Sequence, residues 1–301
     1  MKIKEIATAL GENEIKIDSL FNHPGLVEKT GISQVYSTNH STVDLATRAV
    51  LALKINKTNF KPKLLVLVTQ SPDDALPANS IKLAYKANLP TDILTFDINQ
   101  GCSGFVQAFC IISKLLGSYN EILLVTADRY RSKLRESDRS TNAVFSDGST
   151  ASLISNEGSY NILFEDHMTA GDKRDLLFQS NGDENDGFLH MSGAEVWLFT
   201  KREVVPQINK AIKFSDDNGF IIKGVYLHQA SKLVVDGMKD YIELDSELFF
   251  ANYNKHGNTV SSSIPFLIKD FPISLQKGEV VIMAGFGVGL TSTILVYGKE
   301  H

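Results

Sequence analysis

The chain has 301 residues, of which 43% are hydrophobic and 22% charged, and its formal net charge is -5. This is the composition of an ordinary soluble globular protein, and the negative charge gives no reason to expect nucleic acid as a partner. No window is long and apolar enough to span a bilayer, so no membrane association is expected. A length above the usual size of a single core favours two domains or one duplicated unit.

The cysteine content and the N-terminal stretch indicate where the protein works. The two cysteines, Cys102 and Cys110, do not make a disulfide framework, which favours a reducing compartment. The opening stretch MKIKEIATALGENEIKI lacks a sustained apolar core and soon becomes acidic, unlike a signal peptide. We therefore expect a soluble, cytoplasmic protein.

Residues 1–157 alternate strand-like and helix-like segments. A first strand is expected at residues 2–7, and Ser41 is placed to cap a helix over residues 43–53. Strands alternating with helices indicate a largely parallel α/β sheet. The other expected elements of this half are strands at 64–69, 93–99, 121–126, 143–145 and 149–154, and a helix at 80–87.

The stretch 93–116, ILTFDINQGCSGFVQAFCIISKLL, places Cys102 between a buried strand and a helix. Gly101 and Gly104 bracket Cys102, and apolar residues then recur at helical spacing. The free amides and the positive dipole end at a helix N-terminus lower the pKa of a thiol. Cys102 is therefore a candidate nucleophile. The alternative is a small buried hydrophobic residue, and Cys110 in the same helix fits that alternative.

Residues 158–301 repeat the alternation of strands and helices. Helical spacing over 195–214 predicts a helix that Pro206 should kink or divide, and 231–242 is a further helix. These two α/β halves are consistent with an internal duplication, although no literal repeat is visible. The strands expected in the second half are 162–166, 224–227, 279–284 and 292–296.

His228, in LHQAS, follows the strand at 224–227 and precedes a helix that Ser231 is placed to cap. The carboxyl ends of strands are where α/β folds place ligand chemistry. A surface or hydrogen-bonded structural histidine is the alternative. His256 has no comparable setting and is expected to be exposed or structural.

Two further segments complete the set of candidates. Asn258, in YNKHGNTVSSSIP, lies in a stretch of turn composition, where asparagine is common for local reasons. The run 285–290, GFGVGL, has alternating glycines that let backbone amides approach a ligand closely. Phosphate binding is the rival interpretation of this run. However, the helix that should follow such a loop is missing, because residues 291–297 read as a strand.

Four motifs in this order resemble the β-ketoacyl-acyl-carrier-protein synthase III family of the thiolase-like superfamily: GCSGF, LHQAS, HGNTVSSSIP and GFGVGL. The similarity extends through DRSTNAVFSDGSTASLI, MSGAEVW and KTGI, and so spans nearly the whole chain. It implies a duplicated five-layer α/β/α/β/α fold, with halves at 1–157 and 158–301, and a homodimer. It also implies a catalytic set of Cys102, His228 and Asn258.

The resemblance further implies a mechanism for fatty-acid-type chain building. The Cys102 thiolate would attack an acyl-CoA or acyl carrier protein thioester, with the amides of Cys102 and Val288 as oxyanion donors. A malonyl thioester would then lose carbon dioxide, with His228 and Asn258 donating hydrogen bonds to the enolate oxygen. CoA or phosphopantetheine enters as the thioester substrate. No resident cofactor and no metal site are expected.

Departures from the family pattern bear on the substrate. Arg139 is retained in the DR motif, but Gly25 and Lys29 stand where acyl-CoA-using relatives carry an adenine-stacking tryptophan and arginine. CoA binding should therefore be weak, and a carrier protein or another thioester is a plausible donor. Trp197 is placed to replace some of the aromatic surface, or is simply core. Leu76 matches a position that lines the acyl pocket from across the dimer.

Two smaller features also concern substrates. Phe286, in the glycine-rich run, is a further candidate for substrate binding. Carrier proteins are acidic, so an acidic enzyme needs a local basic patch to dock one. Lys232 and Lys239 are candidates for that patch, and ordinary solvated lysines are the alternative.

Three classes of function stay open on sequence alone. The first is the decarboxylating condensing enzyme. The second is an acyltransferase on the same scaffold, passing the acyl group from Cys102 to an oxygen, nitrogen or sulfur nucleophile in a specialised pathway. The third is a non-enzymatic partner in a heteromeric synthase, against which the intact Cys102, His228 and Asn258 count. Release of carbon dioxide from a malonyl thioester separates the first two classes.

Overall fold

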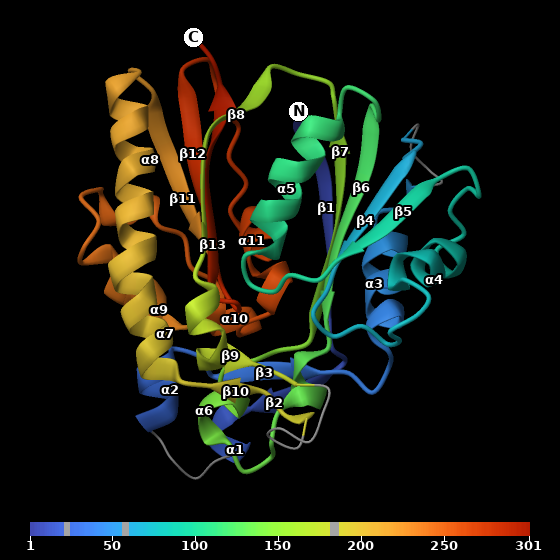
Figure 1. Cartoon of the computed structure of the whole chain (residues 1–301), viewed down its shortest axis with the longest axis vertical. Coiled ribbons are helices and arrows are strands. Elements are labelled where there is room, and N and C mark those ends of the chain that lie inside the picture. Colours follow the sequence, from blue (N-terminus) through green and yellow to red (C-terminus); the bar gives the residue numbers. More distant parts are fainter. Residues whose placement is uncertain (21–24, 56–59, 181–186) are drawn as a thin grey trace.

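A computed structural model of the chain describes residues 1–20, 25–55, 60–180 and 187–301. In this part of the chain the two larger of four β-sheets stand side by side, with helix α5 (Gly104–Leu115) between them (Figure 1). The first sheet has the strand order β1-β7-β6-β4-β5, and the second β11-β12-β13-β8. The strands of the first sheet are β1 (Lys2–Leu10), β4 (Leu64–Val68), β5 (Leu94–Ile98), β6 (Glu121–Asp128) and β7 (Gly148–Ser155). Those of the second are β8 (Tyr160–Thr169), β11 (Ile221–Leu227), β12 (Glu279–Gly287) and β13 (Thr291–Lys299).

Alternation along β4 shows how the first sheet is covered on both faces. Leu64, Val66 and Val68 pack into the core that contains the apolar side of α5. Leu65 and Leu67 point the other way, as successive strand residues do, and pack with α3 (Thr42–Ala52) and α4 (Asn79–Lys86). A strand buried on both faces reads as a continuous apolar run, which is why LLVLV was recognisable in the sequence.

The central strand β12 is buried in the same way in the second sheet. Val281 and Met283 join the core around α5 and α11 (Ser263–Asp270). Ile282 and Ala284 pack with α8 (Val205–Asp217) on the outer side. The layers are therefore helix, sheet, helix, sheet, helix, and the predicted five-layer α/β/α/β/α thiolase-like architecture is confirmed.

The pairings are mixed, but most strands of each large sheet share one direction, with β7 reversed in the first sheet and β13 in the second, so the prediction of a largely parallel sheet is confirmed. β4 pairs in parallel with β5 and β6, and β11 pairs in parallel with β12. The other pairings, β1 with β7, β6 with β7, β12 with β13 and β13 with β8, are antiparallel. β12 and β13 are joined by a short turn, and so short a connection permits only antiparallel pairing.

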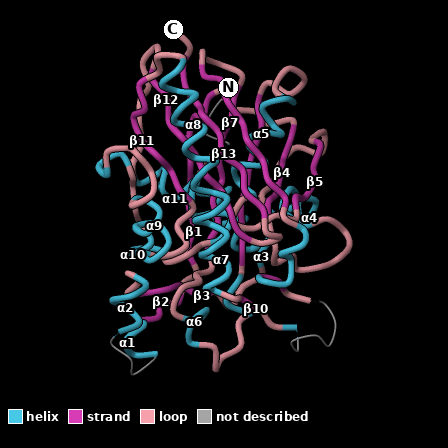
Figure 2. The backbone as a smooth tube through the Cα atoms, turned by 60° about the vertical axis from the view of Figure 1, so that its left-hand side comes forward, coloured by secondary structure: helices cyan, strands magenta, loops and turns pink. Residues whose placement is uncertain are grey.

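Short elements gather at the end of the molecule opposite the two termini, as Figures 1 and 2 both show. The elements at this end are α1 (Ile17–Leu20), α2 (Gly25–Thr30), α6 (Arg139–Asn142), β2 (Asn13–Lys16), β3 (Gln34–Ser37) and β10 (His190–Met191). The remaining short elements are β9 (Leu177–Phe178), α7 (Gly193–Phe199), α9 (Lys232–Lys239) and α10 (Tyr253–His256).

Two local predictions about helices hold. Ser41 caps α3, because its hydroxyl oxygen accepts the backbone N–H of Asp44 at 3.1 Å. The helix predicted over 195–214 is divided into α7, a π-helical turn (Thr200–Val204) and α8, whose first turn contains Pro206. The π-helical turn lies just before Pro206, which has no N–H group to continue the helical hydrogen bonds.

Two strand predictions need correction. The segment 143–145 is a turn, in which Phe145 makes only an isolated bridge to Asn258. The strand β5 is real, but it lies at an edge of its sheet and is not buried, with Leu94 exposed. Apolar residues favour a strand at both segments. Only the pairing with other strands shows that 143–145 is a turn and that β5 is an edge strand.

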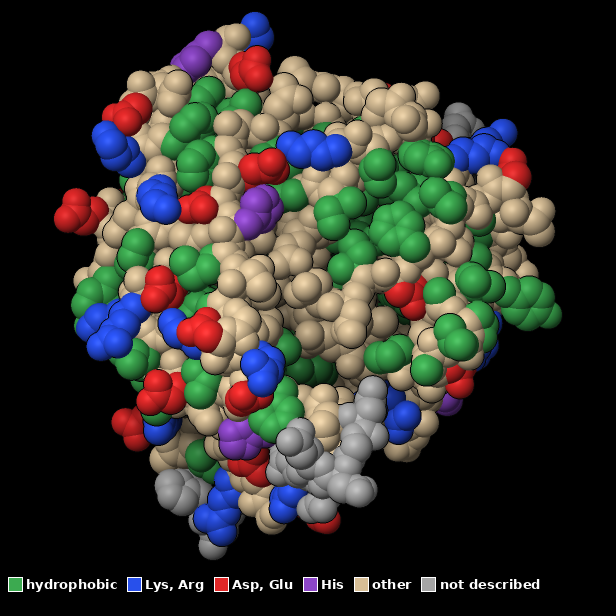
Figure 3. Space-filling model, viewed as in Figure 1, with side chains coloured by type: hydrophobic (Ala, Val, Ile, Leu, Met, Phe, Trp, Pro, Cys, Tyr) green, Lys and Arg blue, Asp and Glu red, His purple; other side chains and the backbone are tan. Residues whose placement is uncertain are grey.

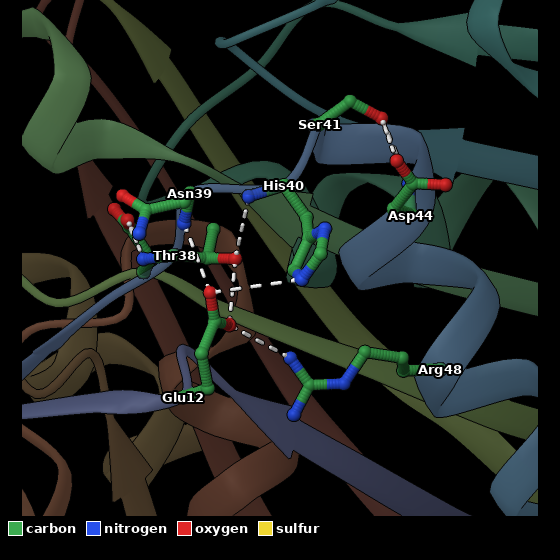
Figure 4. A network of polar contacts seen from close by, with 8 residues as sticks. Glu12, Thr38, Asn39, His40, Ser41, Asp44 and Arg48 are labelled. Carbon is green, nitrogen blue, oxygen red and sulfur yellow. Dashed lines mark hydrogen bonds and ion pairs between the residues drawn. The ribbon is translucent and has the colours of Figure 1, made fainter.

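A polar network holds the loop between β3 and α3 against the turn that follows β1 (Figure 4). One carboxylate oxygen of Glu12 accepts the backbone N–H of Asn39 at 3.0 Å. The other accepts the hydroxyl of Thr38 at 2.8 Å and lies 3.2 Å from a guanidinium nitrogen of Arg48 on α3. The amide of Asn39 is the main reason that the pKa of Glu12 falls to about 2.

The strands of the two sheets come from different stretches of the chain. All strands of the first sheet lie before residue 156 and all strands of the second lie after residue 159. That the halves 1–157 and 158–301 are separate domains stays a prediction. No helix in the described part of the chain is long and apolar enough to cross a membrane.

Candidate active site

Cys102 lies in the turn between β5 and α5, next to Ser103, which begins the helix. The residue is only 6% exposed, and the end of β12 passes directly against it. A Cβ atom on Gly287 would lie 2.7 Å from the Cβ of Cys102, and one on Gly285 would lie 2.9 Å from the Cα of Ser103. The glycines of the GFGVGL run are therefore needed for close approach to the thiol.

Burial raises the pKa of the Cys102 thiol well above its ordinary value, and the nearby carboxylate of Asp128 raises it further. This is opposite to the effect predicted from the helix N-terminus. The reason is that burial destabilises the thiolate by more free energy than the backbone amides and the helix dipole stabilise it at this site. Cys102 is therefore a protonated thiol in the free protein, and it must lose its proton during any attack on a thioester.

His228 directly follows β11 and is 2% exposed. Its Nδ1 lies 2.7 Å from the hydroxyl oxygen of Ser263 at the start of α11. Burial lowers the pKa of His228 to about 3, so its imidazole is neutral near pH 7. A serine hydroxyl can donate to Nδ1 or accept from it, and so Ser263 can serve either neutral tautomer.

Asn258 is also buried, at 3% exposure, and its backbone is fixed on both sides. Its N–H donates to the carbonyl of Val144, and its carbonyl accepts the N–H of Ser146, both at 2.9 Å. The side-chain oxygen accepts the N–H of Val260 at 2.9 Å, which makes Nδ2 the side-chain donor. Val260 has a φ of +55°, a costly conformation for a β-branched residue, so this turn is held under strain.

Apolar contacts connect the three predicted catalytic residues. The ring of Phe286 meets His228 edge-on, with ring centroids 5.5 Å apart. Gly287, the next residue along β12, packs on Cys102. Phe145, which bridges to Asn258, packs its ring 4.9 Å from that of Tyr130. One buried cluster contains Cys102, Tyr130, Phe145 and Phe286. The fold thus brings these regions of the sequence to one junction at the carboxyl ends of β5 and β11, and the catalytic roles stay a prediction.

A hydrogen-bonded chain ties the predicted oxyanion loop to the Cys102 turn. Val288 follows β12, and its carbonyl accepts the hydroxyl of Thr291 at 2.9 Å. The same Thr291 oxygen lies 2.8 Å from the hydroxyl oxygen of Ser103. Either hydroxyl can be the donor in this second bond. Sequence reasoning missed both hydroxyls: Ser103 lies within the GCSGF motif but was given no role there, and Thr291 directly follows the GFGVGL run.

Asp128, at the end of β6, is the other buried polar residue that sequence reasoning missed. Its carboxylate accepts the backbone N–H of Gln70 at 2.8 Å and is hydrogen-bonded to both the amide and the hydroxyl of Ser261. Burial raises the pKa of Asp128 to about 7. The signal that could have found it is an acidic residue at the carboxyl end of a buried strand, in LLVTAD.

The four predicted substrate-binding residues differ in their surroundings. Phe286 is buried beside His228, as described above, and Arg139 is exposed at the start of α6. Trp197 is half-buried on α7, and its ring packs against Gly237 of α9 so closely that a Cβ there would lie 2.8 Å away. Leu76 is 86% exposed. Its predicted place in a partner's acyl pocket therefore stays a prediction.

The segment that departs from the family pattern forms helix α2, which carries Gly25 and Lys29. This helix leads to Gly31, which packs on the side chain of Lys232 at the start of α9. Trp197 packs on the same helix α9, so α2 and Trp197 converge on it. Of the two lysines proposed for a basic patch, Lys239 is paired with Asp236 at 3.1 Å.

His256 proves structural, as expected. Its Nε2 lies 2.9 Å from a carboxylate oxygen of Asp270, and its ring packs against Phe266 with centroids 4.8 Å apart. Burial lowers the pKa of His256, although Asp270 opposes this effect.

Two family models match the chain. The model for 3-oxoacyl-[acyl-carrier-protein (ACP)] synthase III matches residues 96–171, and the model for the C-terminal part of the same enzyme matches residues 221–298. The β-ketoacyl-[acyl-carrier-protein] synthase III of Lactococcus lactis subsp. cremoris strain MG1363 is 30% identical, over 96% of this chain and 96% of the relative. The chain belongs to the β-ketoacyl-acyl-carrier-protein synthase III family.

Other relatives and solved structures agree with this assignment. The synthase III of Streptococcus agalactiae strain NEM316 is 30% identical, over 87% of this chain and 86% of the relative. A crystal structure of a 3-oxoacyl-(acyl-carrier-protein) synthase III matches with a TM-score of 0.88 and 25% identity, covering 98% of both chains. OleA from Xanthomonas campestris, at 15% identity and a TM-score of 0.81, shares the fold.

Proposed function

We propose that this synthase III family member condenses an acyl thioester with a malonyl thioester, with loss of carbon dioxide, through an acyl group carried on Cys102. The observation that carries the proposal is the junction itself. There a buried thiol lies against Gly287 at the end of β12, and a neutral histidine and a fixed asparagine amide belong to the same junction. These are the nucleophile and the hydrogen-bond donors that a thioester condensation needs.

In the acylation step, the sulfur of Cys102 bonds to the thioester carbonyl carbon and the donor thiol leaves. Because burial keeps the thiol of Cys102 protonated, a base must accept its proton as the bond forms. Neutral His228 can do so through Nε2 when Nδ1–H donates to Ser263. The backbone amides of Cys102 and Val288 are the proposed donors to the tetrahedral oxyanion.

In the condensation step, the same residues face a developing enolate. The malonyl carbon–carbon bond breaks, carbon dioxide leaves, and the carbanion attacks the carbonyl carbon of acyl-Cys102. With Ser263 donating to Nδ1, the Nε2–H of His228 becomes a donor to the enolate oxygen, beside Nδ2 of Asn258. The carbon–sulfur bond to Cys102 then breaks, and the released thiolate takes up one proton from solvent to restore the thiol.

We further propose a homodimer formed through β5. This strand has one unpaired edge, and exposed hydrophobic side chains gather over it and α4, where Figure 3 shows a broad apolar surface. The exposed residues of this region are Leu76, Ile81, Tyr85 and Leu94. An exposed apolar edge strand is a template for pairing with another chain. Sedimentation equilibrium should give twice the chain mass, and a monomer at micromolar concentration would refute this part of the proposal.

Intact-protein mass spectrometry tests the nucleophile. Wild-type protein incubated with an acyl thioester should gain a single acyl group, located by peptide mapping at Cys102. Cys102→Ser should gain none and keep its helical circular dichroism, because the site is a turn outside α5. Acylation of Cys110 in place of Cys102 would contradict the assignment.

A further inference from the structure

Three side chains with metal-binding atoms lie together on α5 and β8, away from the Cys102 turn. The sulfur of Cys110, a carboxylate oxygen of Glu165 and an imidazole nitrogen of His167 are all within 4.8 Å of one another. Cys110 belongs to the middle of α5, whereas Glu165 and His167 alternate on β8 and so share one face of the strand. The sequence showed no metal motif because the fold, and not local spacing, joins these residues.

His167 is already oriented as a metal-binding histidine would be. Its Nδ1 lies 3.0 Å from the hydroxyl oxygen of Thr293, the residue opposite it on the neighbouring strand β13. Metal-ligating histidines usually engage their second nitrogen in such a bond, which fixes the tautomer and the ring plane. With Nδ1 held by Thr293, Nε2 is the nitrogen that can bind a cation.

The thiol of Cys110 and the carboxylate of Glu165 are held in contact at this site. Cys110 is only 5% exposed, and its sulfur lies within 4.8 Å of a carboxylate oxygen of Glu165. A divalent cation would replace the thiol proton and relieve the repulsion between thiolate and carboxylate. Glu165 also pairs with Lys114 at 3.1 Å, but the lysine side chain is largely exposed and can move away.

We propose that Cys110, Glu165 and His167 bind a zinc-type divalent cation, with water as the fourth ligand, and that this ion joins α5 to the second sheet. Thiolate, imidazole and carboxylate together select Zn²⁺ or its chemical relatives, whereas Mg²⁺ and Ca²⁺ prefer oxygen ligands alone. Metal–ligand lengths of about 2.0–2.3 Å place the donor atoms of a tetrahedral site roughly 3.3–3.8 Å apart. Side-chain movements of about 1 Å would therefore complete the site.

The site is structural in character, and it is not part of the condensation chemistry. Cys110 follows Cys102 by about 12 Å along the helix axis, from the rise of about 1.5 Å per residue. A cation bound there would stabilise the packing of α5, whose N-terminus carries the Cys102 turn. Binding should therefore raise the midpoint of thermal unfolding in proportion to the logarithm of free metal concentration.

Cobalt spectroscopy of tag-free protein tests the proposal. A Cys102→Ser background removes the other thiol, so any sulfur-to-cobalt charge-transfer band comes from Cys110. Titration with Co²⁺ should produce this band and the strong visible bands of tetrahedral cobalt at about one ion per chain. Zn²⁺ should displace the cobalt, and Mg²⁺ should not.

Matched variants complete the test. On the same background, Cys110→Ser should abolish the charge-transfer band, and Thr293→Val should weaken binding about 10- to 100-fold through the orientation of His167. His190→Ala, which alters a histidine outside the cluster, should change nothing. A missing band, a band that survives Cys110→Ser, or an unchanged affinity in Thr293→Val overturns the proposal.

Discussion

At the scale of single residues, the hydrogen bond between His228 and Ser263 is the contact on which the proposed chemistry depends most. The two half-reactions ask opposite things of Nε2: it accepts a proton in the first and donates a hydrogen bond in the second. Ser263 can donate or accept at Nδ1, so it supports both tautomers of a buried, neutral imidazole. We therefore expect Ser263 to act as a positioning residue.

Ser263→Ala tests this role. The variant should lower kcat for condensation about 10- to 100-fold with little change in KM, because the imidazole loses its tautomer control but the substrate contacts remain. Ser262→Ala is the matched control, since the hydroxyl of Ser262 bonds to Thr126 and not to the histidine. Steady-state kinetics measure both variants. Equal losses in the two would show that Ser263 has only a packing role.

At the scale of elements, the approach of β12 to the Cys102 turn fixes the geometry of the site. Gly287 packs on the thiol, and Thr291 connects Val288 to Ser103 by two hydrogen bonds. The end of β12 and the start of α5 are thus held at a fixed position relative to each other. Sub-ångström placement of an oxyanion loop relative to its nucleophile matters because catalysis depends on near-attack geometry.

Gly287→Ala should therefore abolish acylation of Cys102. The new methyl group would lie 2.7 Å from the Cβ of Cys102 and 3.1 Å from its sulfur, so strand and turn must separate. Gly117→Ala, where the added methyl group meets nothing within 4 Å, is the control and should acylate normally. Mass spectrometry measures the rate of acyl-enzyme formation in both variants. Normal acylation of Gly287→Ala would show that the loop is not in contact with the nucleophile.

The Glu12 network makes a prediction for stability against pH. The folded pKa of Glu12, about 2, lies below its ordinary value of 4.5, so folding favours the ionised form. The contribution of Glu12 to the free energy of unfolding is fully present above about pH 4.5 and disappears as the pH falls towards 2. Glu12→Gln should lose on the order of 1 kcal/mol at pH 7, discounted for solvent screening, and almost nothing near pH 2. Urea unfolding measures this, with the exposed Glu14→Gln as control; a pH-independent difference would contradict the network's role.

Sequence patterns identified the individual strands and helices better than the way in which the strands pair. Apolar runs such as LLVLV located the buried strands, and the glycines around Cys102 located the turn at the start of α5. The edge position of β5 and the antiparallel pairings were not predictable, because they depend on contacts between distant segments. The raised pKa of Cys102 was missed for the same reason, since burial by other elements outweighs the local helix terminus.

At the scale of the whole molecule, the open question is which carrier delivers the acyl group. The helix α2 presents Gly25 and Lys29, and so lacks an aromatic ring on which adenine could stack. We expect similar KM values for acyl-CoA and for a truncated acyl-pantetheine, and a lower KM for an acyl carrier protein. If acyl-CoA is clearly the better of the two small donors, other residues, with Arg139 and Trp197 the first suspects, recognise the nucleotide.

Gly25→Trp should supply the missing surface. Stacking of an aromatic side chain on a base is worth roughly 1–3 kcal/mol, so the KM for acyl-CoA should fall about 5- to 150-fold. The KM for acyl-pantetheine, which has no base, serves as the internal control and should not change. A lower KM for both donors would indicate that Trp contacts the acyl-pantetheine part that they share, and not the adenine.

Carbon dioxide release tests the central claim most directly. Wild-type protein, acylated at Cys102 and then given a malonyl thioester labelled in its free carboxyl group, should release about one labelled carbon dioxide for each 3-oxoacyl product. Asn258→Ala should reduce this release about 10²- to 10³-fold, because it removes a donor to the enolate oxygen. His228→Ala should reduce it at least as much, because it removes both such a donor and the base of the acylation step. Transfer of the acyl group to an oxygen, nitrogen or sulfur acceptor without any labelled carbon dioxide would contradict the account and establish a heteroatom acyltransferase.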